Sequence, residues 1–167
     1  MLEKLLREKK WKSYLLESFM NKESRQVLDI GCGTATLTLM LKQKFPAATV
    51  TGLDGDTKVL TIAEKKVNTQ RAEIKLLNGY SYDLPFSDNY FDAISSSLML
   101  HHLTTEDKYR PFKEVLRVLK PGGEFNIADW GKPATIGFRI LFYLVQLLDG
   151  FATTEDNVKG LIVEAAH

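Results

Sequence analysis

The sequence has little cysteine and no excess of charge of either sign, and both shortages exclude classes of protein. Cys32 is the one cysteine among 167 residues, so no disulfide can form within the chain, which predicts a cytoplasmic location. Lys and Arg together number 22, against 21 Asp and Glu. Such a balance lacks the electrostatic footprint of a protein that wraps nucleic acid. We therefore expect no nucleic-acid partner.

Long apolar runs are also absent. The most apolar stretch, 136–151, is shorter than the roughly 20 residues of a membrane span, and Arg139, Gln146 and Asp149 interrupt it. Residues 1–25 mix basic and acidic side chains around no apolar core, so we expect no signal peptide. The remaining composition, 44% apolar and 26% charged residues, is that of one ordinary globular domain. We predict a single domain and no membrane span.

Strand-like and helix-like segments alternate along the chain. Strands are predicted at 26–30, 48–53, 73–77, 91–96 and 124–130, helices at 2–22, 34–45, 56–70 and 104–119, and a turn at 120–123. Asp56 is the predicted N-cap of the third helix. The alternation predicts an α/β fold, Rossmann-like and doubly wound, with a mainly parallel sheet of about five strands. The domain divides into an N-terminal helix (1–24), a cofactor-binding core (25–130) and a helical C-terminal segment (131–167).

A glycine loop follows the first predicted strand. Gly31 allows a tight turn there, and Gly33 lets a ligand approach the backbone. Asp54 ends the second strand, where a carboxylate can accept hydrogen bonds from both hydroxyls of a ribose. Because ligands of such sheets bind at the carboxyl ends of the strands, loops 31–36, 54–56, 79–86 and 97–104 are expected to converge on one cleft. The alternative is a tight turn that binds nothing.

Two side chains bear on the kind of cofactor. A dinucleotide site would place a third glycine where Thr36 stands. Asp29 precedes the loop, where its carboxylate would repel a pyrophosphate and suit a ligand with an amino group or a positive centre. These departures favour a charged nucleoside over NAD. An NAD-dependent oxidoreductase remains the less favoured alternative.

Five motifs, in order along the chain, carry a family resemblance. They occupy 27–34, 52–54, 84–92, 100–103 and 114–123. With them the sequence resembles the class I S-adenosylmethionine-dependent methyltransferases, in particular the small-molecule branch typified by ubiquinone and menaquinone methyltransferases. The resemblance implies S-adenosyl-L-methionine as cofactor and methyl transfer to a small-molecule acceptor by in-line displacement. A non-catalytic partner subunit of the same fold is the alternative.

The resemblance also implies a role for each matching residue. Gly31 and Gly33 would lie against the methionine part of the cofactor, with Asp29 near its amino group, directly or through water. The other expected contacts are Asp54 to the ribose, Leu53 and Gly55 beside the adenosine, Ser81 at the adenine edge, and Ser97 and Leu98 on the methionine and acceptor side. Tyr80 stands where the family often has an Asp for the adenine amino group. Tyr80 offers a ring to stack and a hydroxyl, without a fixed charge.

Methyl transfer needs no nucleophilic side chain, and needs a base only where the acceptor must lose a proton. His101 and His102, which follow the fourth predicted strand, are the candidate bases. Their alternative role is to cap the next helix or to pack in the loop. Cys32 is interpreted as a small packing residue rather than a nucleophile. We predict no metal site, because no set of side chains has ligand spacing.

The sequence contains fewer indications of the acceptor and of the oligomeric state. Enzymes that resemble the nucleic-acid amino methyltransferases carry a motif after the fourth strand, an Asn or Asp followed by two prolines and an aromatic residue. Residues 95–99 lack this motif, which argues against methylation of base amino groups. The apolar segment 136–151 is core, a subunit interface or a lid over an apolar acceptor. The sheet of the family that the sequence resembles has seven strands, and we expect its C-terminal antiparallel hairpin to be missing here. A homodimer through the fifth strand or the 136–151 helix is predicted, with a truncated chain as the alternative.

Overall fold

The computed structural model describes residues 8–20, 23, 25–99 and 105–129. Within them lie α2 (Glu8–Ser18), β1 (Gln26–Ile30), α3 (Thr36–Lys44), β2 (Thr49–Asp54), α4 (Thr57–Thr69), β3 (Ile74–Asn78), β4 (Phe91–Ser97), α5 (Thr105–Val118) and β5 (Leu119–Ala128). The strands form a five-stranded sheet in the order β3-β2-β1-β4-β5. Every pair of neighbours in that sheet is parallel. The predicted fold class is confirmed.

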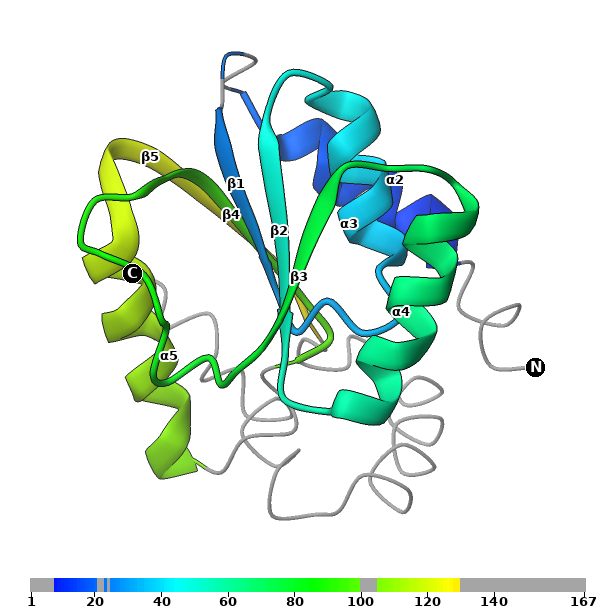
Figure 1. Cartoon of the computed structure of the whole chain (residues 1–167). Coiled ribbons are helices and arrows are strands. Elements are labelled where there is room, and N and C mark those ends of the chain that lie inside the picture. Colours follow the sequence, from blue (N-terminus) through cyan, green and yellow to red (C-terminus); the bar gives the residue numbers. More distant parts are fainter. Residues whose placement is uncertain (1–7, 21–22, 24, 100–104, 130–167) are drawn as a thin grey trace, which may run out of the picture.

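Helices cover both faces of the sheet (Figure 1). On one face, α2 and α3 bury Leu15, Phe19 and Leu37 against Val27 of β1 and other strand residues. On the opposite face, Val115 and Val118 of α5 meet Leu28, Ile94 and their neighbours. Successive strand residues therefore serve opposite cores, as the two-residue period of a strand requires. This double cover leaves the carboxyl ends of the strands as the edge open to a ligand.

Local signals place several element boundaries. The side chain of Asp56 accepts hydrogen bonds from the amides of Lys58, at 2.8 Å, and Val59, at 3.4 Å, at the start of α4. That is the geometry of an N-cap, and it confirms the predicted role of Asp56. The helix predicted at 34–45 is shorter in the structure, because Ala35 takes a left-handed φ of 59° and α3 begins at Thr36, two residues later than predicted, and ends at Lys44.

The start of β5 differs from its predicted place. A turn was expected at 120–123 and a strand from residue 124, yet Leu119 already pairs with Phe91, and Glu124 then pairs with Ala93. The intervening residues bulge out of the ladder, with Gly122 at a φ of 76°. Lys120 is held there by an ion pair with Asp92 at 2.7 Å. The expected turn is therefore a bulge inside the strand, and the turn chemistry alone did not reveal the pairing on its N-terminal side.

Three sequence expectations lie outside the described residues. These are the histidine pair His101 and His102, the C-terminal segment 131–167 with its apolar stretch 136–151, and the part of the N-terminal helix before residue 8. The homodimer predicted through the fifth strand or the 136–151 helix stays a prediction. Among the residues that the structure describes, no helix combines the length and apolar content needed to cross a bilayer.

Candidate cofactor site

A cavity of about 570 Å³ opens at the carboxyl ends of the strands. Segments from α2, the glycine loop, the end of β2, the chain after β3 and the end of β4 line it. Of the residues predicted from the sequence, it brings together Gly31, Gly33, Leu53, Asp54, Gly55, Tyr80, Ser81, Ser97 and Leu98. A cavity of this volume lies in the range that suits small-molecule ligands and cofactors. The predicted convergence of loops therefore holds for their described parts.

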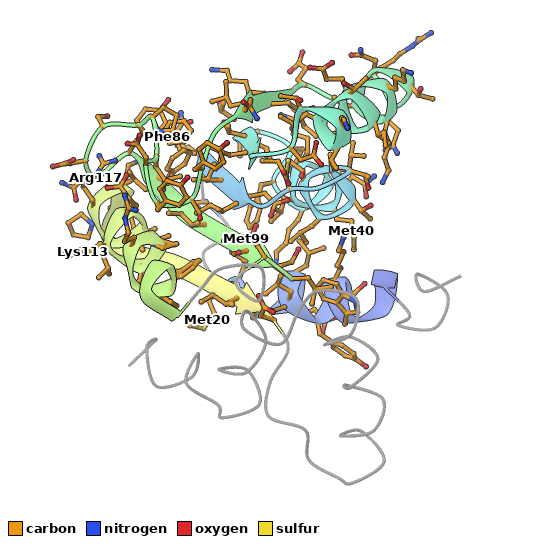
Figure 2. All side chains as sticks on the ribbon, turned by 90° about the horizontal axis from the view of Figure 1, so that it is seen from below. Met20, Met40, Phe86, Met99, Lys113 and Arg117 are labelled. Carbon is orange, nitrogen blue, oxygen red and sulfur yellow. The ribbon has the colours of Figure 1, made fainter. Side chains whose placement is uncertain are left out.

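The glycine loop forms one wall of this cavity through its backbone. Gly31 has a φ of 69°, and its amide donates to the Leu53 carbonyl at 2.8 Å. A Cβ at Gly31 would come within 2.6 Å of the Met99 side chain, which lies at the centre of the view onto the carboxyl ends of the strands (Figure 2). Gly33 has a φ of 55°, and no described atom lies within 4 Å of its Cβ position. The Cβ side of Gly33 is therefore open to a ligand, whereas Met99 occupies that side of Gly31, and both glycines line the cavity.

The Asp54 carboxylate is fixed at the rim by two backbone amides. Its Oδ2 accepts from the Gly33 amide at 2.8 Å, and its Oδ1 accepts from the Asp56 amide at 2.9 Å. An ionised carboxylate has about four acceptor sites. Two of them are used here, so both oxygens retain capacity toward ligand hydroxyls.

An aromatic stack forms the wall that follows β3. The Tyr80 ring lies parallel to the Tyr82 ring, with centroids 5.2 Å apart, and the Arg110 guanidinium lies 4.7 Å above Tyr82. Tyr80 is 56% exposed, and its ring is 3.0 Å from the Cβ position of Gly55. Ser81 is buried beside it. The tyrosine at the family's acid position thus offers an edge and a hydroxyl at the rim.

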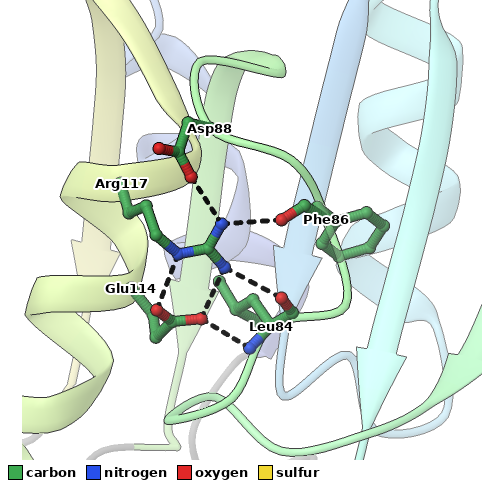
Figure 3. A network of polar contacts seen from close by, with 5 residues as sticks. All are labelled: Leu84, Phe86, Asp88, Glu114 and Arg117. Atoms are coloured by element: carbon green, nitrogen blue, oxygen red, sulfur yellow. Dashed lines mark hydrogen bonds and ion pairs between the residues drawn. The ribbon is translucent and has the colours of Figure 1, made fainter.

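Charged side chains from α5 clamp the segment 84–88 that continues this wall (Figure 3). Arg117 donates to the carbonyls of Leu84, at 2.9 Å, and Phe86, at 2.7 Å. It also pairs with Asp88 at 2.9 Å and with Glu114 at 2.7 Å. Glu114 in turn accepts from the Leu84 amide at 2.7 Å. Its hydrogen bond to Arg117 is the largest cause that lowers the pKa of Glu114.

Asp29 lies beneath the glycine loop and is not among the residues that line the cavity. The carboxylate is fully buried and accepts hydrogen bonds from Thr38 Oγ1 at 2.7 Å and Ser95 Oγ at 2.8 Å. Burial raises the pKa of Asp29 to about 6, against the opposing effects of these hydroxyls and of the Lys12 charge. Asp29 therefore joins β1, α3 and β4 from below, and its expected contact with a cofactor amino group stays a prediction.

Cys32 is buried in the same loop. Burial, followed by the charges of Asp29 and Asp54, raises the pKa of its thiol far above the usual range. Its Sγ lies 3.0 Å from the Cβ position of Gly52, so the side chain fills space against β2. A thiol that stays protonated is a poor nucleophile, in line with the interpretation of Cys32 as a packing residue.

Trp11 and Lys12 also line the cavity, and no pattern in the sequence predicted them there. Both belong to α2, whose apolar and charged residues alternate as in any amphipathic helix. Lys12 is only 8% exposed, and its ammonium nitrogen lies 5.4 Å from the centre of the Trp11 ring. Their place at the cavity follows only from the packing of α2 beside the glycine loop.

A parallel sheet with this strand order, a glycine loop after its central strand and an acid at the end of the next strand defines the Rossmann-like class of α/β proteins. Within that class, the chain belongs to the methyltransferase-domain family, whose model matches residues 27–123. Within the described residues there is no group of three or more His, Cys, Asp or Glu that would hold a metal ion.

Curated relatives and solved structures agree with this assignment. A demethylmenaquinone methyltransferase from a Geobacillus strain is 34% identical over 139 residues, which is 82% of this chain and 58% of the relative. The enzyme of the same name from Bacillus subtilis is 33% identical over 138 residues, or 81% of this chain and 58% of the relative. A SAM-dependent methyltransferase structure from Aquifex aeolicus superposes with a TM-score of 0.66 at 24% identity, over 87% of this chain and 78% of that one, which shows the shared fold. The chain thus spans a little over half the length of the curated relatives.

Proposed function

We propose that the protein transfers a methyl group from S-adenosyl-L-methionine to a small-molecule acceptor. The observation that carries the proposal is the Asp54 carboxylate, which Gly33 and Asp56 hold at the rim of the cavity with acceptor capacity to spare. That arrangement suits the two hydroxyls of a ribose. Membership of the methyltransferase-domain family supports the same cofactor.

The residues present fit this cofactor along the length of the cavity. The open space at Gly33 admits a ligand against the loop backbone. Leu53, Gly55 and Val59 supply an apolar flank for a base, and Ser81 lies where its edge would fall. When bound, S-adenosyl-L-methionine would supply a methyl group on a sulfonium, and the neutral thioether S-adenosylhomocysteine would be the leaving group.

The chain's own contribution to the reaction is therefore position and exclusion of water. Ser97 at the end of β4, with Leu98 and Met99 after it, forms the side of the cavity beyond the glycine loop, where an acceptor would approach. A base there would serve an acceptor that loses a proton, and His101 and His102 remain the proposed candidates. The names of the relatives support a quinone-type acceptor that is small and apolar.

Calorimetry tests the cofactor directly. We expect heat of binding with S-adenosylmethionine and with S-adenosylhomocysteine, and none with NAD. Asp54→Asn is expected to weaken both by about tenfold or more, because an amide accepts fewer hydrogen bonds than a carboxylate. Asp83→Asn, at an exposed acid outside the cavity wall, is the matched control and is expected to bind normally. Heat with NAD but with neither sulfur nucleoside would overturn the proposal.

The alternative of a non-catalytic partner of the same fold is motivated by Tyr80. Its ring is committed to Tyr82 and Gly55 at the position where the family often has an acid. Under that alternative the cofactor binds and no acceptor is methylated. Transfer of a labelled methyl group to any of a panel of reduced quinones would exclude it.

A further inference from the structure

Three planar side chains are stacked one against the next beside the cavity. The rings of Tyr80 and Tyr82 are nearly parallel, with an interplanar angle of 9° and centroids 5.2 Å apart. The guanidinium carbon of Arg110, in α5, lies 4.7 Å from the centre of the Tyr82 ring. Both tyrosines line the cavity, whereas Arg110 is not among its lining residues. The stack therefore connects α5 with the cavity wall at Tyr80.

Burial does not hold the Tyr80 ring in place. Tyr80 is 56% exposed, and an exposed side chain ordinarily moves between several rotamers. The backbone beside it is held, because the Asp83 amide donates to the Tyr80 carbonyl at 3.2 Å in a short turn. That turn fixes the Cα of Tyr80 and leaves its χ angles free. Stacking on Tyr82 is thus a contact that selects one place for the ring.

The selected place lies where a ligand base would meet it. A carbon of the Tyr80 ring is 3.0 Å from the Cβ position of Gly55, the residue after Asp54. The ring therefore stands beside the flank where the proposed function places the base of the cofactor. Aromatic side chains bind bases by stacking. A ring already held in its bound position loses no rotamer freedom when the base arrives, and this pre-organisation strengthens binding.

We propose that Arg110 and Tyr82 are positioning residues that hold the Tyr80 ring for the base of the cofactor. The inference rests on the proposed function and deepens it, because it makes the affinity for the base depend on a residue of α5 that does not line the cavity. A guanidinium is attracted to the negative face of an aromatic ring, and its planar shape suits stacking. Arg110 thus acts on the ligand through two rings in turn.

A double-mutant cycle tests this series of contacts, with the affinity for S-adenosylhomocysteine measured by calorimetry. Arg110→Met is expected to weaken binding about threefold, the size of an exposed cation–π contact, and Tyr82→Leu about fivefold, the size of an aromatic pair. Tyr82→Phe keeps the ring and is expected to bind as tightly as the wild-type protein. In a Tyr80→Leu background, Arg110→Met should have no further effect, because the ring through which it acts is gone.

The controls separate this inference from a general effect of charge and from the proposed function. Lys113→Met removes an exposed cation of the same helix and should leave the affinity unchanged in either background. A threefold loss that persisted in the Tyr80→Leu background would show that Arg110 acts without Tyr80, which would overturn the inference. Unchanged binding by the single Arg110→Met variant would overturn it as well. If the wild-type protein did not bind S-adenosylhomocysteine, the proposed function itself would fail.

Discussion

The two long walls of the cavity are held in place by different means. The glycine loop is fixed by its own backbone, through left-handed φ angles at Gly31 and Gly33 and an amide bond to Leu53. The wall that follows β3 has no residue with a left-handed φ, although Gly79 donates to the Asp54 carbonyl and Asp83 to the Tyr80 carbonyl. The segment 84–88 that continues it is fixed from outside, where Arg117 and Glu114 of α5 bind its backbone.

The first wall is therefore held by contacts close to it in the sequence, and the second by side chains of a helix far from it in the sequence. A wall held by its backbone tolerates few side chains at the positions with left-handed φ angles, and substitutions there destabilise it by steric clash. A wall held by charged side chains is destabilised when it loses their hydrogen bonds, and its freed backbone groups can then form hydrogen bonds with water. The following changes test that distinction, beginning with the largest expected effect.

Gly31→Ala is expected to cost about 3 kcal/mol of unfolding free energy, from a left-handed φ in a non-glycine residue and from overpacking. The new Cβ would lie 2.6 Å from Met99. Gly33→Ala is the matched control, because it has a similar φ and no neighbour within 4 Å. It is expected to cost about 1 kcal/mol and to weaken the binding of S-adenosylhomocysteine. Equal losses in urea titrations of the two variants would contradict the steric account.

Asp29→Asn probes what lies beneath the glycine loop. Burial raises the pKa of Asp29 from 3.8 to about 6 in the folded protein. The folded state therefore binds the proton more tightly than the unfolded state, and the stability from this proton is complete below pH 3.8 and is lost as the pH rises through 6. Relative to the variant, the wild-type protein should lose about 2 kcal/mol of unfolding free energy between pH 4 and 7. Parallel pH profiles of the two proteins would show that Asp29 does not carry this proton.

Arg117→Met is expected to lower the unfolding free energy by about 2 kcal/mol, because it leaves Glu114 and the carbonyls of Leu84 and Phe86 without their donor. Hydrogen exchange should accelerate at the amides of 79–88 and remain unchanged at those of the glycine loop. Lys113→Met, on the exposed side of the same helix (Figure 2), is the control and should alter neither quantity. Faster exchange in the glycine loop of the Arg117→Met variant would show that the walls are coupled.

The smallest expected effect is a change in the rate at which the Cys32 thiol is alkylated. Its raised pKa and burial predict a reaction with iodoacetamide at pH 8 that is much slower than that of a free thiol. Because the walls are held separately, Arg117→Met should leave this rate unchanged, whereas Gly31→Ala should increase it. A fast reaction in the wild-type protein would show that the loop opens on its own.

The features that local sequence determines were predictable. The glycine loop, the acid at Asp54 and the N-cap at Asp56 each depend on residues within one loop and its flanking elements. Strand and helix alternation was enough for the parallel sheet. The bulge in β5 was missed because it is defined by pairing with β4, where Phe91 pairs with Leu119 and Asp92 forms an ion pair with Lys120.

Features that depend on contacts between segments distant in the sequence could not be predicted from it. Arg117 and Glu114 stand three residues apart, as many surface pairs do, and their backbone partners lie about 30 residues away. The place of Asp29 near a cofactor amino group stays a prediction, and the two hydroxyls that bind its carboxylate, which belong to α3 and β4, were not predicted. The cavity position of Lys12 depends on where α2 docks, which no pattern within that helix specifies.

The place of β1 between β2 and β4 also leads us to expect a particular order of folding. The pairs of β1 with β2 and of β2 with β3 join nearby segments, whereas the β1–β4 pair joins Leu28 to Ile94. Closing that long loop costs chain entropy before its contacts stabilise it, so the docking of β4 is expected to be the slow step. Ser97 and Leu98 arrive with β4. The cavity is therefore complete only after the rate-limiting event, and a cofactor can slow unfolding without speeding the first stages of folding.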